Sequence, residues 1–343
     1  MNLQEVSEKA VSQAQNIISE MKAGKRDKGI DWSKDVLEGK VTIKEMIGTD
    51  DGSEAFVEKV TYDLYQGREN VPLLYGPIYT TKTDANYPKT LTAEEYGPVQ
   101  VVFLEKLEGG EVKFGDLGPG ETKVVTFHTW AAGIEYNEDM VEYNQTWKIS
   151  EIGIAFGEAY NKLLNHLHLY PIISGTYVTT GGGLAAQKAA QEDGTAQLIA
   201  WDTDLETTLR NALTVLPRGT ILLINSADQF VIEDAIAGSL YADNATPSIV
   251  RRKLLPSNII IYDGDEVEVG GKTYEYTGVT AGYAYLLVPK KNFTEYVKHD
   301  LRVDTGDGDL SRLVLDQVVG RSRRGVLTAL GGKYGAVKID IAA

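Results

Sequence analysis

Residues 149–167, with the sequence ISEIGIAFGEAYNKLLNHL, carry the strongest helical pattern in the chain. Apolar side chains recur there at every third or fourth position, which is the spacing of one face of an α-helix. The stripe consists of Ile149, Ile152, Phe156, Ala159, Tyr160, Leu163, Leu164 and Leu167. It extends over about five turns, and Pro171 is expected to end the helix. The centre of the chain is therefore predicted to be one long amphipathic helix.

The segment before this helix, residues 72–127, has the pattern of strands and turns. Val99, Val101 and Phe103 alternate with other residues, and Gly109-Gly110 is typical of a hairpin reversal. The second faces of these strands are short of apolar residues and carry many charges. Because an isolated two-stranded hairpin is marginally stable in water, we expect this hairpin to project from the body and to be stabilised by another surface.

The first 65 residues are predicted to form an arm rather than a domain. The arm begins with an apolar stripe at helical spacing, made of Leu3, Val6, Ala10, Ala14, Ile17, Ile18 and Met21. Residues 21–28 are polar and indicate an extended connector. The cations of this connector could contact nucleic acid, but a run this short is more typical of a solvated linker. They are Lys22, Lys25, Arg26 and Lys28.

Helices and strands alternate after the long helix, between residues 202 and 289, and predict a small α/β domain. A helix is indicated by Leu205, Leu209, Ala212, Leu213 and Leu216. Ser226, followed three residues later by Gln229, is a capping-box signature for the next helix. Strands are predicted at residues 221–224, 259–262, 267–269, 274–276 and 284–288, and beyond this domain at 293–303, 313–319 and 336–341.

The composition excludes several classes of protein. The chain has 343 residues and no cysteine, so thiol nucleophiles, thiolate metal sites and disulfide frameworks are absent. Its net charge of −15 disfavours contact with phosphate backbones unless the cations cluster. The sequence starts without a signal-peptide pattern and has no apolar run long enough to span a membrane, so we expect a soluble intracellular protein. Its 19 tyrosines suit either surfaces that dock partners or a tyrosine-rich core.

Two motifs that could bind small ligands are incomplete. Gly271-Lys272-Thr273 resembles the end of a phosphate loop, but Glu266 stands where the first glycine belongs. The aspartates of residues 304–309 could surround calcium, yet Leu315 stands where a bidentate glutamate belongs. We expect residues 304–309 to be a solvated turn between two strands.

The residues for metal or nucleophilic catalysis are also sparse. His166 and His168 are two positions apart on a helix, so their side chains point in different directions and cannot share one ion without other ligands. No G-x-S-x-G elbow is present in the sequence. We therefore assign no catalytic, metal-binding or cofactor-binding residue.

The order of these segments resembles that of the major capsid proteins of tailed bacteriophages, whose Hong Kong ninety-seven-type fold is shared with bacterial encapsulins. An arm, a charged hairpin, a long helix, an α/β domain and returning long strands follow one another in that order. The resemblance covers the chain from about Ala55 to the end. Its most suggestive stretches are residues 285–290 (YLLVPK), 300–303 (DLRV), 319–326 (VGRSRRGV) and 335–338 (GAVK).

The resemblance implies an α+β fold with the parts of a phage major capsid protein. Residues 1–65 would be the N-terminal arm, and residues 72–127 the extended β-hairpin loop that lies over a neighbouring subunit. The peripheral domain would comprise residues 128–201 and 290–343, with a spine helix at 137–170, and the α/β axial domain would comprise residues 202–289. The short arm is similar to that of members with a separate scaffold, or to a form that lacks a scaffolding segment.

The function implied by the resemblance is structural. Copies of the chain would assemble into pentamers and hexamers of an icosahedral head that encloses the phage genome, with no enzymatic activity, cofactor or membrane. Further partners would be a separate scaffolding protein, a portal and a decoration protein. The protein would be part of the virion and would be assembled in the host cytoplasm. Two alternatives stay open, namely an encapsulin-like shell around protein cargo and an intracellular α/β enzyme.

Seven charged residues are candidates for assembly contacts. They are Lys82, Lys89, Lys106, Glu108, Lys113, Arg251 and Arg252. Some relatives crosslink a loop lysine to an asparagine on a neighbour. None of the four lysines in the projecting segment matches a motif for that reaction, so ordinary solvated lysines are favoured.

Overall fold

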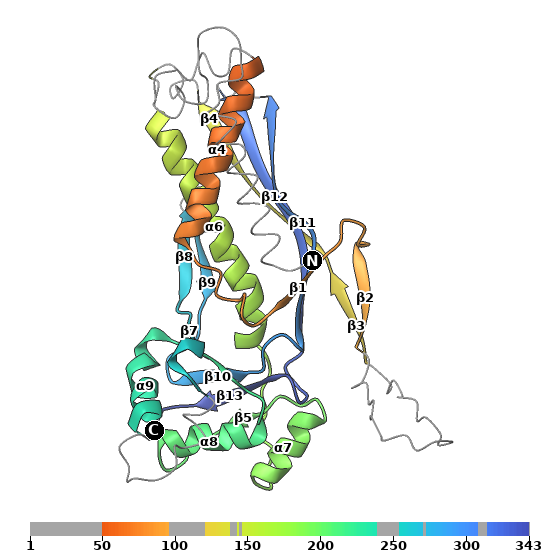
Figure 1. Cartoon of the computed structure of the whole chain (residues 1–343), viewed down its shortest axis with the longest axis vertical. Coiled ribbons are helices and arrows are strands. Elements are labelled where there is room, and N and C mark those ends of the chain that lie inside the picture. The colour runs from red at the N-terminus through yellow and green to blue at the C-terminus, as the bar shows by residue number, and fades with distance from the viewer. Residues whose placement is uncertain are drawn as a thin grey trace, which may run out of the picture.

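The computed structural model describes residues 50–95, 121–137, 143, 146–238, 254–269, 272–307 and 314–342. The described chain is elongated (Figure 1). Two long helices and a four-stranded sheet run along its long axis, and an α/β unit lies at one end. A mixed arrangement of helices and sheets was expected, and the structure confirms it at this level.

Helices α4 (Asp50–Asn70) and α6 (Thr146–Ile173) pack side by side along the elongated part. Their backbones touch through glycines. A Cβ atom on Gly67 would lie 2.0 Å from the carbonyl oxygen of Ile154, and one on Gly157 would lie 2.0 Å from that of Leu64. Only residues without a side chain allow this separation, so the glycines set the distance between the two helices.

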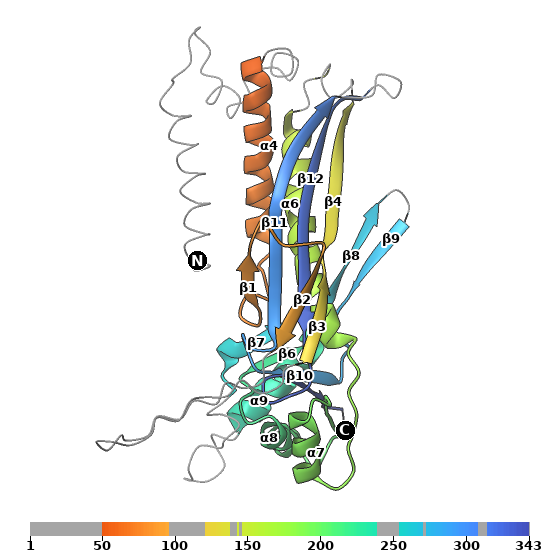
Figure 2. The ribbon, with the colours of Figure 1, turned by 90° about the vertical axis from the view of Figure 1, so that its right-hand side faces the viewer.

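The four-stranded sheet has the order β1-β11-β12-β4. Its strands are β1 (Thr80–Thr83), β4 (His128–Asn137), β11 (Phe293–Asp307) and β12 (Val314–Thr328). β1 pairs with β11 in parallel, whereas the other pairs are antiparallel. Helix α6 packs against one face of this sheet, and Figure 2 shows the long strands beside the two helices.

The α/β unit is built on a five-stranded sheet of order β5-β13-β10-β6-β7. Its strands are β5 (Leu198–Ile199), β6 (Ile221–Ile224), β7 (Ile259–Ile261), β10 (Tyr283–Leu287) and β13 (Ala336–Asp340). Its helices are α7 (Leu184–Glu192), α8 (Leu205–Val215) and α9 (Gln229–Gly238), with 3-10 turns at Ser226–Asp228 and Pro256–Asn258. Leu209, Leu222 and Leu286 lie in its core.

Two small antiparallel strand pairs complete the described part of the chain. β2 (Thr90–Glu95) pairs with β3 (Glu121–Thr126), and β8 (Gly264–Val269) pairs with β9 (Lys272–Thr277). The pair β8–β9 packs on α6, where Lys162 Nζ lies 3.0 Å from Asp265 Oδ1. None of the described helices is long and apolar enough to span a membrane.

Several local predictions were wrong. Pro171 does not end α6, which continues to Ile173. A proline in the last helical turn removes only one backbone hydrogen bond, and the Tyr170 carbonyl still accepts from the Ser174 amide at 2.8 Å. Ser226 does not cap α9. The side chain of Asn225 instead accepts a hydrogen bond from the Ala227 amide and starts a short 3-10 turn before the helix.

Two strands also lie elsewhere than expected. β1 was expected in the projecting hairpin, but it pairs with β11 in the main sheet. β13 was expected with the returning strands of the peripheral part, but it lies between β5 and β10 in the α/β unit. The apolar side chains of β13 fit that position because Val337 and Ile339 are fully buried in the core there.

Candidate functional site

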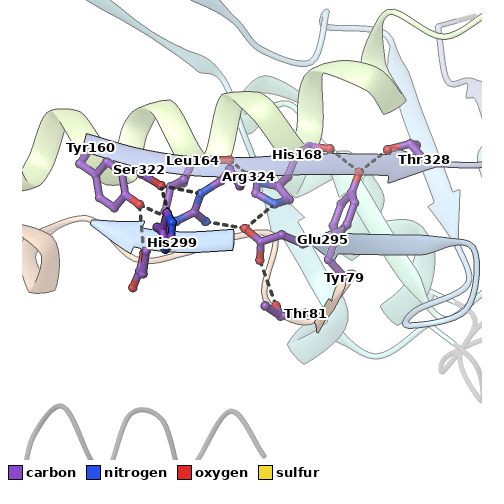
Figure 3. Close-up of polar contacts among 11 residues, drawn as sticks. Tyr79, Thr81, Tyr160, Leu164, His168, Glu295, His299, Ser322, Arg324 and Thr328 are labelled. Atoms are coloured by element: carbon purple, nitrogen blue, oxygen red, sulfur yellow. Dashed lines mark hydrogen bonds and ion pairs between the residues drawn. The ribbon is translucent and has the colours of Figure 1, made fainter. Parts of the chain in front are cut away.

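The charged residues with the deepest burial lie between α6 and the four-stranded sheet. Glu295 on β11 and Arg324 on β12 are 1% and 4% exposed, and Nη1 of Arg324 donates a hydrogen bond to Oε1 of Glu295. Nη2 of Arg324 donates to Oδ1 of Asp300 at 2.8 Å and to the Tyr160 hydroxyl. Nε of Arg324 donates to the Ser322 hydroxyl at 3.1 Å. One guanidinium therefore joins both long strands to the helix (Figure 3).

His168 of α6 completes this cluster and is fully buried. Its Nε2 lies 3.1 Å from Oε1 of Glu295, and its Nδ1 lies 2.6 Å from the Leu164 carbonyl oxygen (Figure 3). Both ring nitrogens thus face oxygen acceptors.

Strand β1 and Tyr79, which precedes it, are tied to the same cluster. Oγ1 of Thr81 donates a hydrogen bond to Oε2 of Glu295 at 3.0 Å. The Tyr79 hydroxyl donates to the His168 carbonyl oxygen at 2.7 Å and lies 2.7 Å from Oγ1 of Thr328. These contacts hold the short strand β1 at the edge of the sheet, although its sequence, TTKT, offers little apolar surface to bury.

Two asparagines of α6 bind the backbone at the end of α4 and in the segment that follows it. Nδ2 of Asn161 donates to the carbonyl oxygens of Arg68 and Val71 at 2.6 and 2.8 Å. Oδ1 of Asn165 accepts from the Leu74 amide at 2.8 Å, and Nδ2 of Asn165 donates to the Pro72 carbonyl oxygen at 3.0 Å. The chain that leaves α4 therefore has its polar groups satisfied by one face of α6.

The charges in the cluster stabilise one another. Burial alone would raise the pKa of Glu295, but His168, Arg324 and Thr81 together lower it to about 2. Burial would likewise raise the pKa of Asp300, whereas the nearby Arg324 and Arg68 lower it. Glu295 is thus ionised at neutral pH, and the buried carboxylate is compensated by cations and donors.

The cluster has the features of a structural tie rather than of a reaction site. Glu295, His168 and Arg324 are each less than 5% exposed, so a substrate could not reach them without separation of α6 from the sheet. A groove at the end of α8 is lined instead by residues that include Lys188, Arg218 and Lys333. No group of three or more metal-ligating side chains is found among the described residues.

The buried face of α6 differs from the predicted apolar stripe. Leu164 is 1% exposed, but Leu163 is only partly buried. The polar residues Asn161, Asn165 and His168 are almost completely buried. The sequence carried no signal for this cluster, because Glu295, Arg324 and His168 are far apart in the chain and each is ordinary in its local pattern.

The β2–β3 hairpin contacts its own subunit at its base. Val125 and Phe127 are 1% and 3% exposed and pack with Tyr296 on the sheet face that is turned away from α6. Val124, on the other side of β3, is 61% exposed. We expected the hairpin to be stabilised by another surface, but its base packs on the sheet of its own subunit.

The candidate assembly residues are only partly covered by the structure. Lys82 lies on β1, exposed, with its Nζ 5.6 Å from the centroid of the Tyr296 ring. Lys89 is exposed just before β2, and its carbonyl oxygen accepts from the Phe127 amide at 3.0 Å. The two lysines are thus near the hairpin base. Lys106, Glu108, Lys113, Arg251 and Arg252 lie outside the described residues.

Comparison with known proteins gives matches only among solved structures. No family model and no curated protein matches the chain. The mature capsid of bacteriophage PhiM1 is similar at 12% identity and a TM-score of 0.44, covering 78% of this chain and 86% of that one. The virus-like particle from Pyrococcus furiosus has 12% identity and a TM-score of 0.47, covering 82% and 98%. The capsid of the native GTA particle has 12% identity and a TM-score of 0.47, covering 79% and 90%.

Proposed function

We propose that this chain is a major capsid protein of Hong Kong ninety-seven type. Its copies would assemble into pentamers and hexamers of an icosahedral head around a phage genome. The observation that carries the proposal is the β2–β3 hairpin, which is anchored by Val125 and Phe127 but exposes Val124 on its other side. A charged strand pair with an open face is the element by which one subunit can reach the next.

The rest of the fold supports a structural role. The glycine contacts between α4 and α6 and the buried cluster around Glu295 join helices and sheet into one stiff elongated unit. The protein interior transmits strain because it is closely packed, so such a unit can carry load between neighbours. Glu295, whose pKa is lowered to about 2, lies inside this unit and joins β11 to β12 and to α6.

In this proposal the parts keep the roles that the resemblance implies. Residues 1–65 would supply the N-terminal arm, although those from Asp50 onwards belong to α4, which packs on α6. Residues 72–127 would supply the extended loop, although β1 within them pairs with β11 in the main sheet. The long helix α6 and the four-stranded sheet form the peripheral domain, and the five-stranded α/β unit forms the axial domain. β13 then belongs to the axial domain, in contrast to the sequence-based division.

The proposal is tested by electron microscopy of the purified protein. We expect the protein, alone or together with a scaffolding protein, to form capsomers or closed particles at some ionic strength. A chain that stays monomeric by light scattering at all ionic strengths, with and without a scaffold, would contradict the proposal. Nucleic acid inside the particles of infected cells identifies a head, whereas an enclosed protein identifies an encapsulin-like shell.

A further inference from the structure

A cationic groove lies in the α/β unit, where α7 and α8 lie side by side (Figure 1). The charged residues of its lining are Lys188 and Glu192 on α7, Arg218 after the end of α8, and Lys333 before β13. Three cations and one carboxylate give the lining a net charge of +2. The whole chain has a net charge of −15, so the charge of this groove is opposite to that of the protein.

The carboxylate of the lining pairs with one of the three cations. Nζ of Lys333 lies 3.7 Å from Oε2 of Glu192. Among the residues that the structure describes, neither Lys188 nor Arg218 has a carboxylate within ion-pair distance. Nη1 of Arg218 donates a hydrogen bond to the Tyr334 hydroxyl, but a guanidinium has five N–H groups. The groove therefore offers charged donors to a ligand.

A fourth cation, Lys291, lies near the groove. Its Nζ is 5.9 Å from the centroid of the Tyr334 ring, and Cζ of Arg218 is 4.7 Å from the same centroid. The ring attracts both cations and thereby keeps two like charges near each other, although like charges repel. An anion bound beside them would relieve this repulsion.

The helix dipoles account for only part of this cluster. Cations are favoured near the C-terminal end of a helix, and Lys188 of α7 and Arg218 after α8 lie there. Lys333 and Lys291 lie instead in the segments before β13 and β11. Four cations from four parts of the chain thus converge, and an anionic ligand accounts for all of them.

The size and the apolar part of the groove suit a small anion. The remaining lining residues are Val215, Leu216 and Pro217, and Val215 and Leu216 are 1% and 0% exposed. Charged hydrogen bonds are stronger beside such a surface of low dielectric constant than in water. The groove has a volume of about 230 Å³, whereas pockets for drug-sized molecules have about 300–1,000 Å³. A ligand of one or two phosphate groups matches both the charge and the volume.

We propose that the groove between α7 and the end of α8 binds a phosphate group through Lys188, Arg218 and Lys333. The planar guanidinium can donate two parallel hydrogen bonds to phosphate oxygens, and each ammonium group acts as a point charge. The phosphate can be a free ion, such as pyrophosphate, or a phosphodiester of a nucleic acid strand. The site belongs to the single subunit, so it does not depend on the proposed shell function.

The test is calorimetric titration of the full chain at low ionic strength, with pyrophosphate in one arm and a short single-stranded oligonucleotide in the other. We expect one site per subunit, with binding that weakens as salt screens the charges. Lys188→Gln/Arg218→Gln retains the Lys333–Glu192 ion pair and should weaken binding about tenfold or more. The control Lys89→Gln/Lys272→Gln removes two exposed lysines outside the groove and should bind like the unmodified protein.

A second variant keeps the test decisive if the loss of Arg218 from the Tyr334 ring unfolds the protein. Lys188→Glu leaves that contact intact and should abolish binding without a change in melting temperature. Pyrophosphate binding that the groove variants lose identifies a free phosphate as the ligand. Oligonucleotide binding alone, lost in the same variants, identifies a nucleic acid phosphodiester. If neither probe binds, or if the groove variants bind as tightly as the unmodified protein, the proposal is wrong.

Discussion

The ring of Tyr75 lies parallel to the imidazole of His168, with ring centroids 3.6 Å apart and planes inclined by 5°. Tyr75 belongs to the segment between α4 and β1, and His168 belongs to α6. The stacked rings therefore hold this segment against the long helix. The imidazole that stacks on Tyr75 also lies beside Glu295, with its Nε2 3.1 Å from Oε1 of the carboxylate. The same side chain therefore joins this segment, α6 and β11.

Loss of the Arg324 guanidinium should strongly destabilise the subunit. Arg324→Met leaves Glu295 and Asp300 without their shared cation, and removal of one partner of a buried pair costs about 3–5 kcal/mol. Arg321→Met breaks the exposed pair with Asp304 and should cost less than about 1 kcal/mol. Urea unfolding of both variants measures the difference. Equal costs would contradict the structural role of the buried cluster.

Acid should weaken the subunit through Glu295. Its pKa is lowered to about 2 in the fold, whereas an unfolded glutamate titrates near 4.3. A carboxyl group with a depressed pKa contributes stability above its unfolded value and loses that stability as the pH falls through the folded value. We therefore expect a loss on the order of 3 kcal/mol between about pH 5 and pH 2.

The matched variant for this pH dependence is Glu295→Gln. It should be less stable than the unmodified protein at pH 7, and its unfolding free energy should fall less steeply between pH 5 and pH 2. Denaturant unfolding at a series of pH values measures both slopes. Parallel slopes in the two proteins would show that other carboxylates cause the acid sensitivity.

A charged residue on the buried face of α6 should prevent folding. The loss of stability should depend on how deeply the substituted position is buried. Leu164→Asp places an unpaired carboxylate at a site that is 1% exposed, which costs several kcal/mol. Leu163→Asp should be milder because Leu163 is only partly buried. Soluble yield and melting temperature distinguish the two. A more severe effect at Leu163 would mean that the helix is rotated relative to the structure described above.

The close contact of α4 and α6 should not tolerate a methyl group. In Gly157→Ala the new Cβ would lie 2.0 Å from the Leu64 carbonyl oxygen, so the helices must move apart at a cost of about 1–3 kcal/mol or more. Gly181→Ala is the control, because no atom lies within 4 Å of a Cβ at that position. Thermal unfolding compares the pair, and an equally stable Gly157→Ala protein would contradict this helix packing.

Removal of the outer hairpin should separate folding from assembly. Glu95 and Glu121 are cross-strand partners, so a short Gly/Ser linker can replace residues 96–120 without strain at the closure. The retained β1 and hairpin base keep the contacts of Thr81 and Val125. We expect a melting temperature within a few degrees of the unmodified protein and a failure to form particles in electron micrographs. Normal particles would remove the main support for the shell proposal.

The parts of the fold that follow a local period were predictable from the sequence. The long helix and the helix at Leu205–Val215 show apolar residues at helical spacing. The strand at Ile221–Ile224 is a short continuous apolar run and is buried at every position. The strand β12 was predicted to end at Val319, yet it continues to Thr328. Arg324 is buried there only because Glu295, on another strand, compensates its charge.

Contacts between distant residues could not be predicted. Parallel pairing of β1 with β11 joins residues more than 200 positions apart, as in the partners Thr81 and Glu295. Their hydrogen bond depends on tertiary placement, for which the sequence TTKT gives no periodic signal. The pairing of Arg302 with Arg321 was missed for the same reason, because it depends on the register of β11 and β12.

The position of β13 in the five-stranded sheet affects how the chain can fold during synthesis. β13 lies between β5 and β10, although it follows every other strand of that sheet in the sequence. The ribosome must therefore release residues 336–340 before β5 can join the sheet at all. Contacts of such long sequence separation form slowly, and until then the apolar surface of β10 stays open to solvent and to chaperones. The five-stranded sheet of the α/β unit can therefore be completed only in chains that are translated at least as far as Asp340.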